Sequence, residues 1–289
     1  MRDEVLELIE ANLGAHVLAS ARVHGGDTAS AHRLDLDDGR RVFAKTHASP
    51  PAHFFDTEAT GLRWLRDAGA VRVPRVLVVG DRAVHGVDVL ALEWIDVGRA
   101  GPSTDEEFGR ELAHLHLAGA ASFGREDRRT TGSLGLPNDP CDSWTELYRS
   151  RRLLPLADIA ERRGSLPGSA LRGVRTIAAR LEELAGPSEP PARLHGDLWA
   201  GNRLVDLDGH SWLVDPACVG GHREFDLAMM RLFGGFGPAV EAAYDEVHPR
   251  AEGWRDRVEL WQLAPLVVHA IKFGGGYVSA VEQAVGRYA

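Results

Sequence analysis

The first part of the chain carries helical and strand-like patterns in alternation. Apolar residues recur at helical spacing over residues 3–13, and Gly14 can close that helix. Asp38-Gly39 is a strong hairpin signal between two strand-like runs. The strand-like runs of this region are residues 16–24, 30–37 and 41–47. The chain is therefore predicted to begin with a short helix and an antiparallel meander.

A second helix and two further strands complete the predicted N-terminal lobe. Residues 54–68 show helical periodicity, which Gly69 ends. Residues 73–80 and 87–95 are strand-like, and the second run is almost continuously apolar, which is typical of a buried strand. Five strands interrupted by one main helix predict an antiparallel five-stranded sheet in an α+β lobe.

Helical patterns dominate the rest of the chain. They begin at Thr104 and return at residues 143–163, 168–185 and from residue 223 onward. Asp208-Gly209 joins two short strand-like runs, NRLVDL and SWLVDP, into a second predicted hairpin. The Gly- and Pro-containing stretch GRAGPS marks the boundary that divides the chain into a sheet-rich lobe, residues 1–98, and a larger helical lobe, residues 99–289. The predicted fold class is thus α+β and bilobal.

Composition narrows the class of protein. No apolar run approaches the ~20 residues that span a bilayer, and the first residues, MRDEVLELIE, carry acids where a signal peptide has basic residues. Only two cysteines occur, Cys141 and Cys218, which fits a reducing compartment. A net charge of -9 argues against a general nucleic-acid surface. We expect a cytoplasmic monomer without membrane or nucleic-acid partners.

The stretch LHGDLWAGN, residues 194–202, carries the clearest chemical signal. Asp197 precedes Asn202 by five positions, and Asp215 ends the hairpin that follows. The kinase catalytic loop H-R-D-x-x-x-x-N has the same Asp-to-Asn interval, and Asp215 takes the place of the DFG aspartate. Phosphoryl transfer needs a carboxylate beside the acceptor hydroxyl and oxygen ligands for Mg²⁺. This set therefore predicts a kinase, although Asp, Asn and Gly also populate turns without any chemistry.

A kinase needs matching residues in the first lobe, which provides an independent test. Glycines should lie between the first two strands, and Gly25 and Gly26 do. Lys45 lies in the apolar run VFAKT, and Glu58 lies in the following predicted helix, where the two can pair. The fifth strand leads into the hinge position of a kinase, whose backbone would bind adenine at Glu93 and Ile95. Residues 1–98 are therefore predicted to bind nucleotide, and residues 99–289 to hold catalytic and substrate groups.

Together, HGDLWAGN, LVDPA and GHREFDLAMMRLFGGF resemble the fructosamine-3-kinase, or ketosamine-3-kinase, family. This family belongs to the protein-kinase-like superfamily, which also holds aminoglycoside and choline phosphotransferases. The resemblance extends over essentially the whole chain. All these relatives share HGD, but the three motifs together are close to specific for ketosamine kinases. It implies ATP and Mg²⁺ as cofactors and phosphorylation of the O3 hydroxyl of free or protein-bound ketosamines. Such phosphorylation makes the adduct labile and would remove sugar damage from amines.

The resemblance also implies roles for single residues. Asp197 resembles the catalytic base, Lys45 with Glu58 the phosphate-positioning pair, and Asn202 with Asp215 the metal ligands. Asp226 resembles the aspartate that braces the catalytic loop, and Trp199 the aromatic residue that packs against the sugar. The sequence departs from the family pattern at Ala200, where serine is common, and at Asp27 in the loop GGDTAS, so the prediction for that loop is restricted to Gly25 and Gly26.

Several simpler interpretations stay open at this point. His195 is expected to support the loop through packing and backbone hydrogen bonds rather than to act as an acid or base, and Trp199 could be a core residue. Arg223 and Glu224 are interpreted as a solvated or ion-paired helix start that contributes little. The alternatives for the whole protein are an aminoglycoside or choline-type phosphotransferase of the same fold, and a binding protein that has lost catalysis. Because Lys45, Asp197 and Asp215 are all present, the last alternative ranks lowest.

Overall fold

The computed structural model describes residues 1–23, 29–127 and 130–289. The predicted loop glycines Gly25 and Gly26 lie outside the described residues. Two compact units make up the chain. The first contains residues 1–104 and 201–217, and the second contains residues 105–200 and 218–289.

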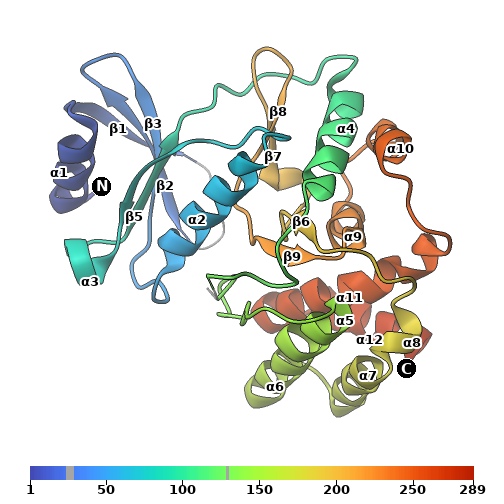
Figure 1. The fold of residues 1–289 in the computed structure, drawn as a ribbon. Helices are drawn as coiled ribbons and strands as arrows, with labels where there is room; N and C mark the ends of the chain where they lie inside the picture. Colours follow the sequence, from blue (N-terminus) through green and yellow to red (C-terminus); the bar gives the residue numbers. More distant parts are fainter. Residues whose placement is uncertain (24–28, 128–129) are drawn as a thin grey trace. The chain divides into compact units, whose positions relative to one another are not determined.

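A five-stranded antiparallel sheet forms the body of the first unit (Figure 1). The strand order is β1-β2-β3-β5-β4. The strands are β1 Val17–Val23, β2 Ser30–Leu36, β3 Arg41–Thr46, β4 Val76–Gly80 and β5 Val89–Glu93, and the helices are α1 Asp3–Leu13, α2 Phe54–Asp67 and the short α3 Arg82–His85. The predicted five strands and main helix are confirmed, and β5 is buried between two neighbouring strands, as its apolar run indicates.

The two faces of this sheet pack against different helices. Val5 and Ile9 of α1 are fully buried in one apolar cluster with Val42 and Ala44 of β3. Because side chains alternate between faces along a strand, the next residue, Lys45, points to the opposite face. That face is covered by α2, as the contact between Lys45 and Glu58 shows. The alternation of the strand therefore places the lysine against the helix that carries its glutamate partner.

The second hairpin, β7 Arg203–Val205 and β8 Ser211–Leu213, belongs to the first unit. The backbone N–H of Gly98 donates to the carbonyl of Val205 at 2.8 Å, and the N–H of Leu213 donates to the carbonyl of Arg72 at 2.9 Å. A Cβ on Gly98 would lie 2.4 Å from the carbonyl oxygen of Asp206, so this close approach requires glycine. The two units therefore differ from the continuous division into residues 1–98 and 99–289.

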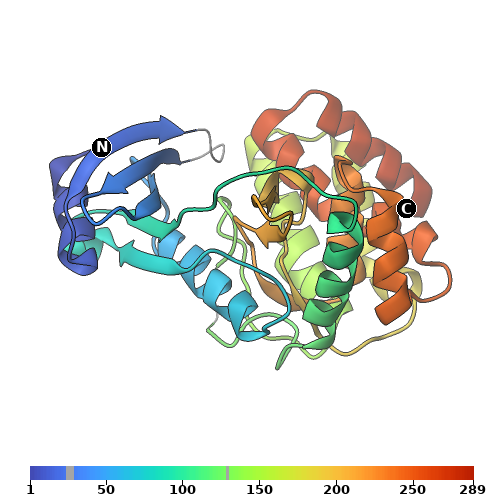
Figure 2. The ribbon, with the colours of Figure 1, turned by 90° about the horizontal axis from the view of Figure 1, so that it is seen from above.

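The second unit is mostly helical, as predicted, and Figure 2 shows its helices from above. They are α4 Thr104–Leu117, α5 Trp144–Leu147, the π-helix η1 Tyr148–Leu153, α6 Leu154–Arg163, α7 Gly168–Ala179, α8 Leu181–Leu184, α9 Glu224–Leu232, α10 Pro238–Val247, α11 Trp254–Phe273 and α12 Gly276–Tyr288. In the part of the chain that the structure describes, no helix is long and apolar enough to cross a bilayer.

Tyr148 ties the π-helix to α11 at the core of the second unit. Pro265 lies inside α11 and has no backbone N–H, so the carbonyl of Trp261, four residues earlier, lacks its usual helical donor. The Tyr148 hydroxyl lies 3.0 Å from that carbonyl and accepts a hydrogen bond from the N–H of Ala264, also at 3.0 Å. One buried side chain thus repairs the break that proline makes in the helix.

Two strands of three residues were not predicted. β6 Ala192–Leu194 and β9 Val219–Gly221 pair as an antiparallel two-stranded sheet. β6 ends directly before His195, and the 3₁₀ turn η2 covers Ala200–Asn202. The pair therefore fixes the segment that leads into the HGD motif.

Candidate functional site

Lys45 lies between two carboxylates within the first unit. Its Nζ atom is 2.9 Å from Oε1 of Glu58 and also donates a hydrogen bond to the carboxylate of Asp215. The side chains of Lys45 and Glu58 are only 5% and 13% exposed, whereas that of Asp215 is 30% exposed. The structure thus brings together three residues that the sequence predicted to act on a nucleotide, from a strand, a helix and the end of a hairpin.

Charge and burial oppose each other in this group. Burial would lower the pKa of Lys45, but the carboxylates of Glu58 and Asp215 outweigh it and raise that pKa. Burial raises the pKa of Glu58, and the charge of Lys45 only partly opposes this effect. The lysine is therefore held as a cation, with its ammonium group fixed beside the more exposed carboxylate of Asp215.

Asn202 and Asp215 provide oxygen atoms that suit a magnesium ion. Asn202 is 5% exposed. Its backbone carbonyl accepts a hydrogen bond of 3.0 Å from the backbone N–H of Val214, which anchors the segment before Asp215. Asp215 has a φ of 54°, a left-handed conformation that aspartate tolerates better than most residues. Hard oxygen donors are the ligands that Mg²⁺ takes, so this carboxamide and carboxylate fit the ion.

Asp226 holds the catalytic loop from within the second unit. Its fully buried carboxylate accepts hydrogen bonds from the backbone N–H groups of His195 and Gly196, at 2.7 and 2.9 Å. Gly196 has a φ of 80°, which a residue with a Cβ rarely adopts. The turn before Asp197 is thus set by one carboxylate and one glycine, which is the bracing geometry that the resemblance implied for Asp226.

His195 and Trp199 lie on either side of Asp197 in the loop. The ring of His195 is buried, and its Nδ1 atom accepts a hydrogen bond of 3.3 Å from the N–H of Asp197. This bond uses the histidine as a backbone support, the arrangement expected of a structural role. Trp199 is 39% exposed and meets Phe233 edge to face at 6.0 Å, so its ring is not a core residue.

Two residues that the sequence reasoning missed extend this network. Nε2 of His116, on α4, lies 3.4 Å from the carboxylate of Asp226, and its Nδ1 lies 2.8 Å from the hydroxyl of Tyr244 on α10. Burial raises the pKa of Tyr244, so its hydroxyl stays protonated and can donate to the imidazole. No sequence signal links these positions, because His116 lies more than a hundred residues before both Asp226 and Tyr244.

The start of α9 is buried, which corrects the expectation of a weak surface helix start. Arg223 and Glu224 are 2% and 3% exposed. Arg223 binds both oxygens of Glu189 at 2.7 and 2.9 Å, and Glu224 binds Arg257 at 2.6 and 2.8 Å. The ion pairing was expected, but solvation was not, and buried bidentate pairs constrain a helix far more than exposed ones.

The predicted hinge residues lie at the end of β5, of which Glu93 is the last residue. The Glu93 N–H donates to the carbonyl of Arg75 at 2.9 Å, and its carboxylate accepts from the N–H of Arg75 at 3.1 Å. Ile95 follows two residues after the end of β5 and is partly buried. Adenine binding by the backbone here stays a prediction.

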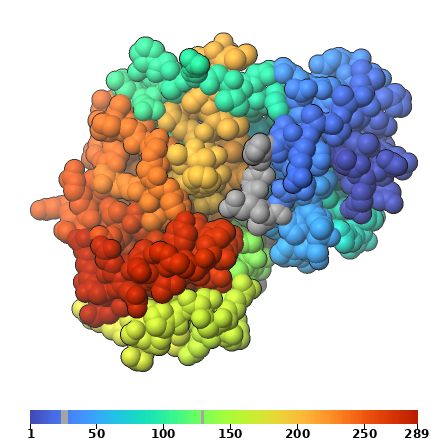
Figure 3. Space-filling model, turned by 180° about the vertical axis from the view of Figure 1, so that it is seen from behind, coloured from blue at the N-terminus to red at the C-terminus, as the bar shows by residue number. Residues whose placement is uncertain are grey.

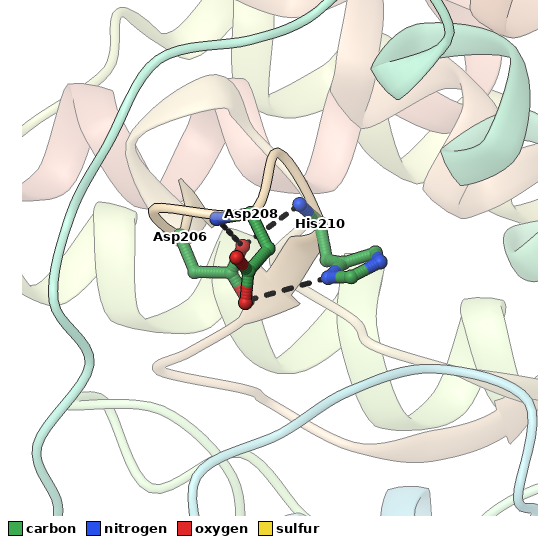
Figure 4. Close-up of side chains that lie close together, drawn as sticks. All are labelled: Asp206, Asp208 and His210. Carbon is green, nitrogen blue, oxygen red and sulfur yellow. Dashed lines mark hydrogen bonds and ion pairs between the residues drawn. The ribbon is translucent and has the colours of Figure 1, made fainter.

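A cluster of metal-type side chains on the β7–β8 turn is explained by the turn itself (Figure 4). The carboxylate of Asp206 accepts hydrogen bonds from the N–H groups of Asp208 and His210, at 3.0 and 2.9 Å, and from Nε1 of Trp212 at 2.8 Å. Burial would raise the pKa of Asp206, but these bonds outweigh it and lower that pKa. The Asp206 carboxylate therefore stabilises the β7–β8 turn, which accounts for the cluster.

A cavity of about 610 Å³ opens among α9, α10 and the start of α11. Arg250 in its wall binds Glu241 and Asp245 at 2.8 and 2.6 Å and stacks over Trp254, 3.6 Å from the ring centroid. Because Arg250 is held by two carboxylates and an aromatic ring, we interpret this part of the wall as a structural ion-pair cluster.

Comparisons with known proteins show which family the chain resembles over its whole length. The sequence profile of the family described as fructosamine kinase matches residues 1–289. A Synechocystis protein assigned as a ketoamine kinase is 35% identical over 86% of this chain and 83% of its own length. The mouse protein named ketosamine-3-kinase is 32% identical over 93% of this chain and 95% of its own length.

Solved structures show the same fold. A crystal structure from Thermobifida fusca, assigned as a fructosamine-3-kinase, has a TM-score of 0.91 at 39% identity and covers 100% of this chain and 99% of its own. A spectinomycin phosphotransferase, solved with ADP and spectinomycin, has a TM-score of 0.60 at 13% identity, with 100% and 93% covered. At that identity the likeness shows the fold alone, which is the protein-kinase-like α+β fold.

Proposed function

Because this chain belongs to the fructosamine kinase family, we propose that it transfers the γ-phosphoryl group of ATP to the O3 hydroxyl of ketosamines. The observation that carries the use of a nucleotide is the buried contact of Lys45 with Glu58 and Asp215. A buried cation fixed beside a more exposed carboxylate suits the binding of phosphate oxygens together with a metal ion. The ketosamine acceptor is supported by the likeness to the mouse ketosamine-3-kinase.

The reaction assigns a separate task to each part of the site. The acceptor hydroxyl oxygen bonds to the γ-phosphorus while the bond from that phosphorus to the oxygen of ADP breaks, and Asp197 receives the hydroxyl proton. Lys45 orients the phosphates. Asn202 and Asp215 would hold Mg²⁺, which neutralises the charge that develops on the phosphate oxygens when bound.

We further propose that the product links this activity to repair. A phosphate at O3 makes the ketosamine adduct labile, so its loss returns a free amine. The two cysteines carry no disulfide in the structure, which suits a reducing compartment such as the cytoplasm.

The function is tested by ATP consumption against a panel of acceptors. The panel contains a fructosamine, a ribulosamine, spectinomycin and choline, and ³¹P–¹H correlation NMR identifies the hydroxyl that receives the phosphate. We expect ADP release with the ketosamines and a product phosphorylated at O3. Turnover of spectinomycin or choline without turnover of either ketosamine would contradict the proposal.

A further inference from the structure

A continuous row of aromatic rings extends from the catalytic loop along the surface of the second unit. We call it the aromatic row. Its members are Trp199, Phe233, His269, Phe273 and Tyr277. Ring centroids lie 6.0 Å apart between Trp199 and Phe233, 5.1 Å between Phe233 and His269, and 5.6 Å between His269 and Phe273. Tyr277 closes the row, 5.0 Å from His269.

Three of the five members of the row are exposed, whereas His269 and Tyr277 are partly buried. Trp199, Phe233 and Phe273 are 39%, 41% and 54% exposed. Among the large apolar side chains that are exposed in residues 1–23, 29–127 and 130–289, these three are the aromatic ones. A contiguous exposed apolar patch on a soluble protein marks a binding surface more often than chance. Figure 3 shows the red C-terminal helices beside the orange segment.

Glycines in two segments of the chain position the members of the row. Gly235 has a φ of 92°, and a Cβ there would lie 2.4 Å from Cβ of Ala200, so the segment after Phe233 lies against the catalytic loop next to Trp199. Gly274 and Gly275 have φ values of 64° and 57° and turn the chain from α11 into α12. These backbone conformations favour glycine over any other residue.

We propose that the aromatic row binds the substituent on the amine nitrogen of the ketosamine, and that aromatic or apolar substituents are preferred. This inference rests on the proposed function, because it places the sugar of the acceptor at Trp199, two residues from Asp197. Sugar hydroxyls need polar partners, whereas the part of the row beyond Trp199 offers ring faces and edges. The acceptor nitrogen is a protonated secondary amine near neutral pH, and ring faces attract such a cation. A long substituent beyond that nitrogen then extends along the row past Phe233 and His269 toward Phe273.

Phe273→Ala tests the row with two acceptors that differ in the substituent alone, N-(4-phenylbutyl)-fructosamine, whose ring can extend along the row, and N-methyl-fructosamine. We expect the variant to raise KM for the phenylbutyl compound about tenfold without a change in kcat, because a ring contact is lost. For the methyl compound, both constants should stay within about twofold of the parent values. An equal effect on the two acceptors, or no effect on either, overturns the proposal.

Leu117→Ala is the matched control, since Leu117 is 52% exposed in the same unit but outside the row. It should leave both acceptors unchanged. Melting temperatures of the two variants report whether either one has unfolded.

Binding separates this inference from the proposed function. Calorimetry with N-(4-phenylbutyl)-fructosamine on Asp197→Asn, with and without Phe273→Ala, needs no turnover. Weaker binding on loss of Phe273 supports the row even if no ketosamine is phosphorylated, a result that would remove the proposed function alone. Equal binding with and without Phe273 overturns the row whatever the protein phosphorylates.

Discussion

Lys45 is the buried cation of the candidate site. The chain contains two lysines among its 33 basic Lys and Arg residues, Lys45 and Lys272. Lys45 is 4% exposed and lies between two carboxylates, whereas Lys272 is exposed at the end of α11. Nearly all the other basic residues are arginines. This buried position instead carries the compact ammonium group of lysine, which suits a phosphate oxygen.

Lys45→Met should damage both stability and nucleotide use. The free energy of unfolding should fall by about 3 kcal/mol, because two largely buried carboxylates lose their cation. The KM for ATP should rise, and kcat should fall by more than about tenfold. Chemical denaturation and ADP-release kinetics measure the two effects. Lys272→Met serves as the control, and comparable losses in both variants would show that burial of Lys45 does not matter.

The spacing of the candidate residues in the loop can be read from the sequence, but the contacts that hold the loop in place cannot. Asp197, Asn202 and Asp215 lie within one motif and the hairpin after it, so their spacing is visible in the chain. His116 contacts Asp226 across 110 positions, and such a pair leaves no local pattern. The exposure of Trp199 was likewise undecided, because sequence does not show which side of a loop faces solvent.

At the scale of elements, α9 is held at its start by two buried ion pairs. Glu224 accepts from Arg257 on α11 and also from Nε1 of Trp261 at 3.0 Å, while Arg223 binds Glu189. Because Asp226 follows directly on the same helix, these pairs also fix the carboxylate that holds the catalytic loop. α9, which is fixed in the core of the second unit, thus holds the loop in place through Asp226.

Arg257→Met should destabilise the protein by about 3 to 5 kcal/mol, because Glu224 would remain buried without its cation. It should also lower kcat more than KM, since Asp226 would shift with α9. Arg287→Met offers a matched comparison, because Arg287 pairs with Asp256 and Glu259 while 43% exposed. That variant should cost less than about 1 kcal/mol. Denaturant unfolding distinguishes the two, and equal costs would contradict the bracing of α9.

Elements with a strong periodic pattern were predicted well, and short ones were not. The Asp38-Gly39 and Asp208-Gly209 hairpins are confirmed, as are the long helices. β6 and β9 have three residues each, too few to show a period. They are strands only because they pair with each other across 25 to 29 positions, from Leu194 with Val219 to Ala192 with Gly221. The π-helix within residues 143–163 has the same apolar spacing as the α-helices around it, so its hydrogen-bond pattern was hidden.

For the whole molecule, the chain crosses between the two units at the motif. Asp197 belongs to the second unit, and Asn202 and Asp215 belong to the first. The sequence predicted a single boundary near residue 98, because composition changes there, but backbone bonds such as Gly98 to Val205 join segments a hundred residues apart. The division between the units thus falls within the motif, between Ala200 and Gly201.

Stability should fall as the pH drops from about 7 to 5. Burial lowers the pKa of His222 and of His248 below the ordinary 6.5. Near pH 6 the unfolded chain therefore binds protons that the folded protein refuses, so acid favours unfolding, and this loss is absent at higher pH. Around His222, the acids Glu189 and Glu224 oppose the shift and Arg223 adds to it. Denaturation midpoints measured across this range test the expectation.

His222→Gln should reduce that loss, because glutamine takes up no proton. His85→Gln is the control, since His85 is exposed on α3. If His222→Gln loses as much stability between pH 7 and pH 5 as the parent protein does, the buried histidine is not responsible.

The central claim is that Asp197 accepts the proton of a ketosamine hydroxyl as ATP phosphorylates it. The most direct measurement is ketosamine-dependent ADP release by Asp197→Asn, with ATP binding measured on the same protein. The account predicts that kcat falls by about a thousandfold or more while ATP still binds, because asparagine keeps the shape of the side chain but takes up no proton. Turnover near the parent rate, with ATP bound, would contradict it.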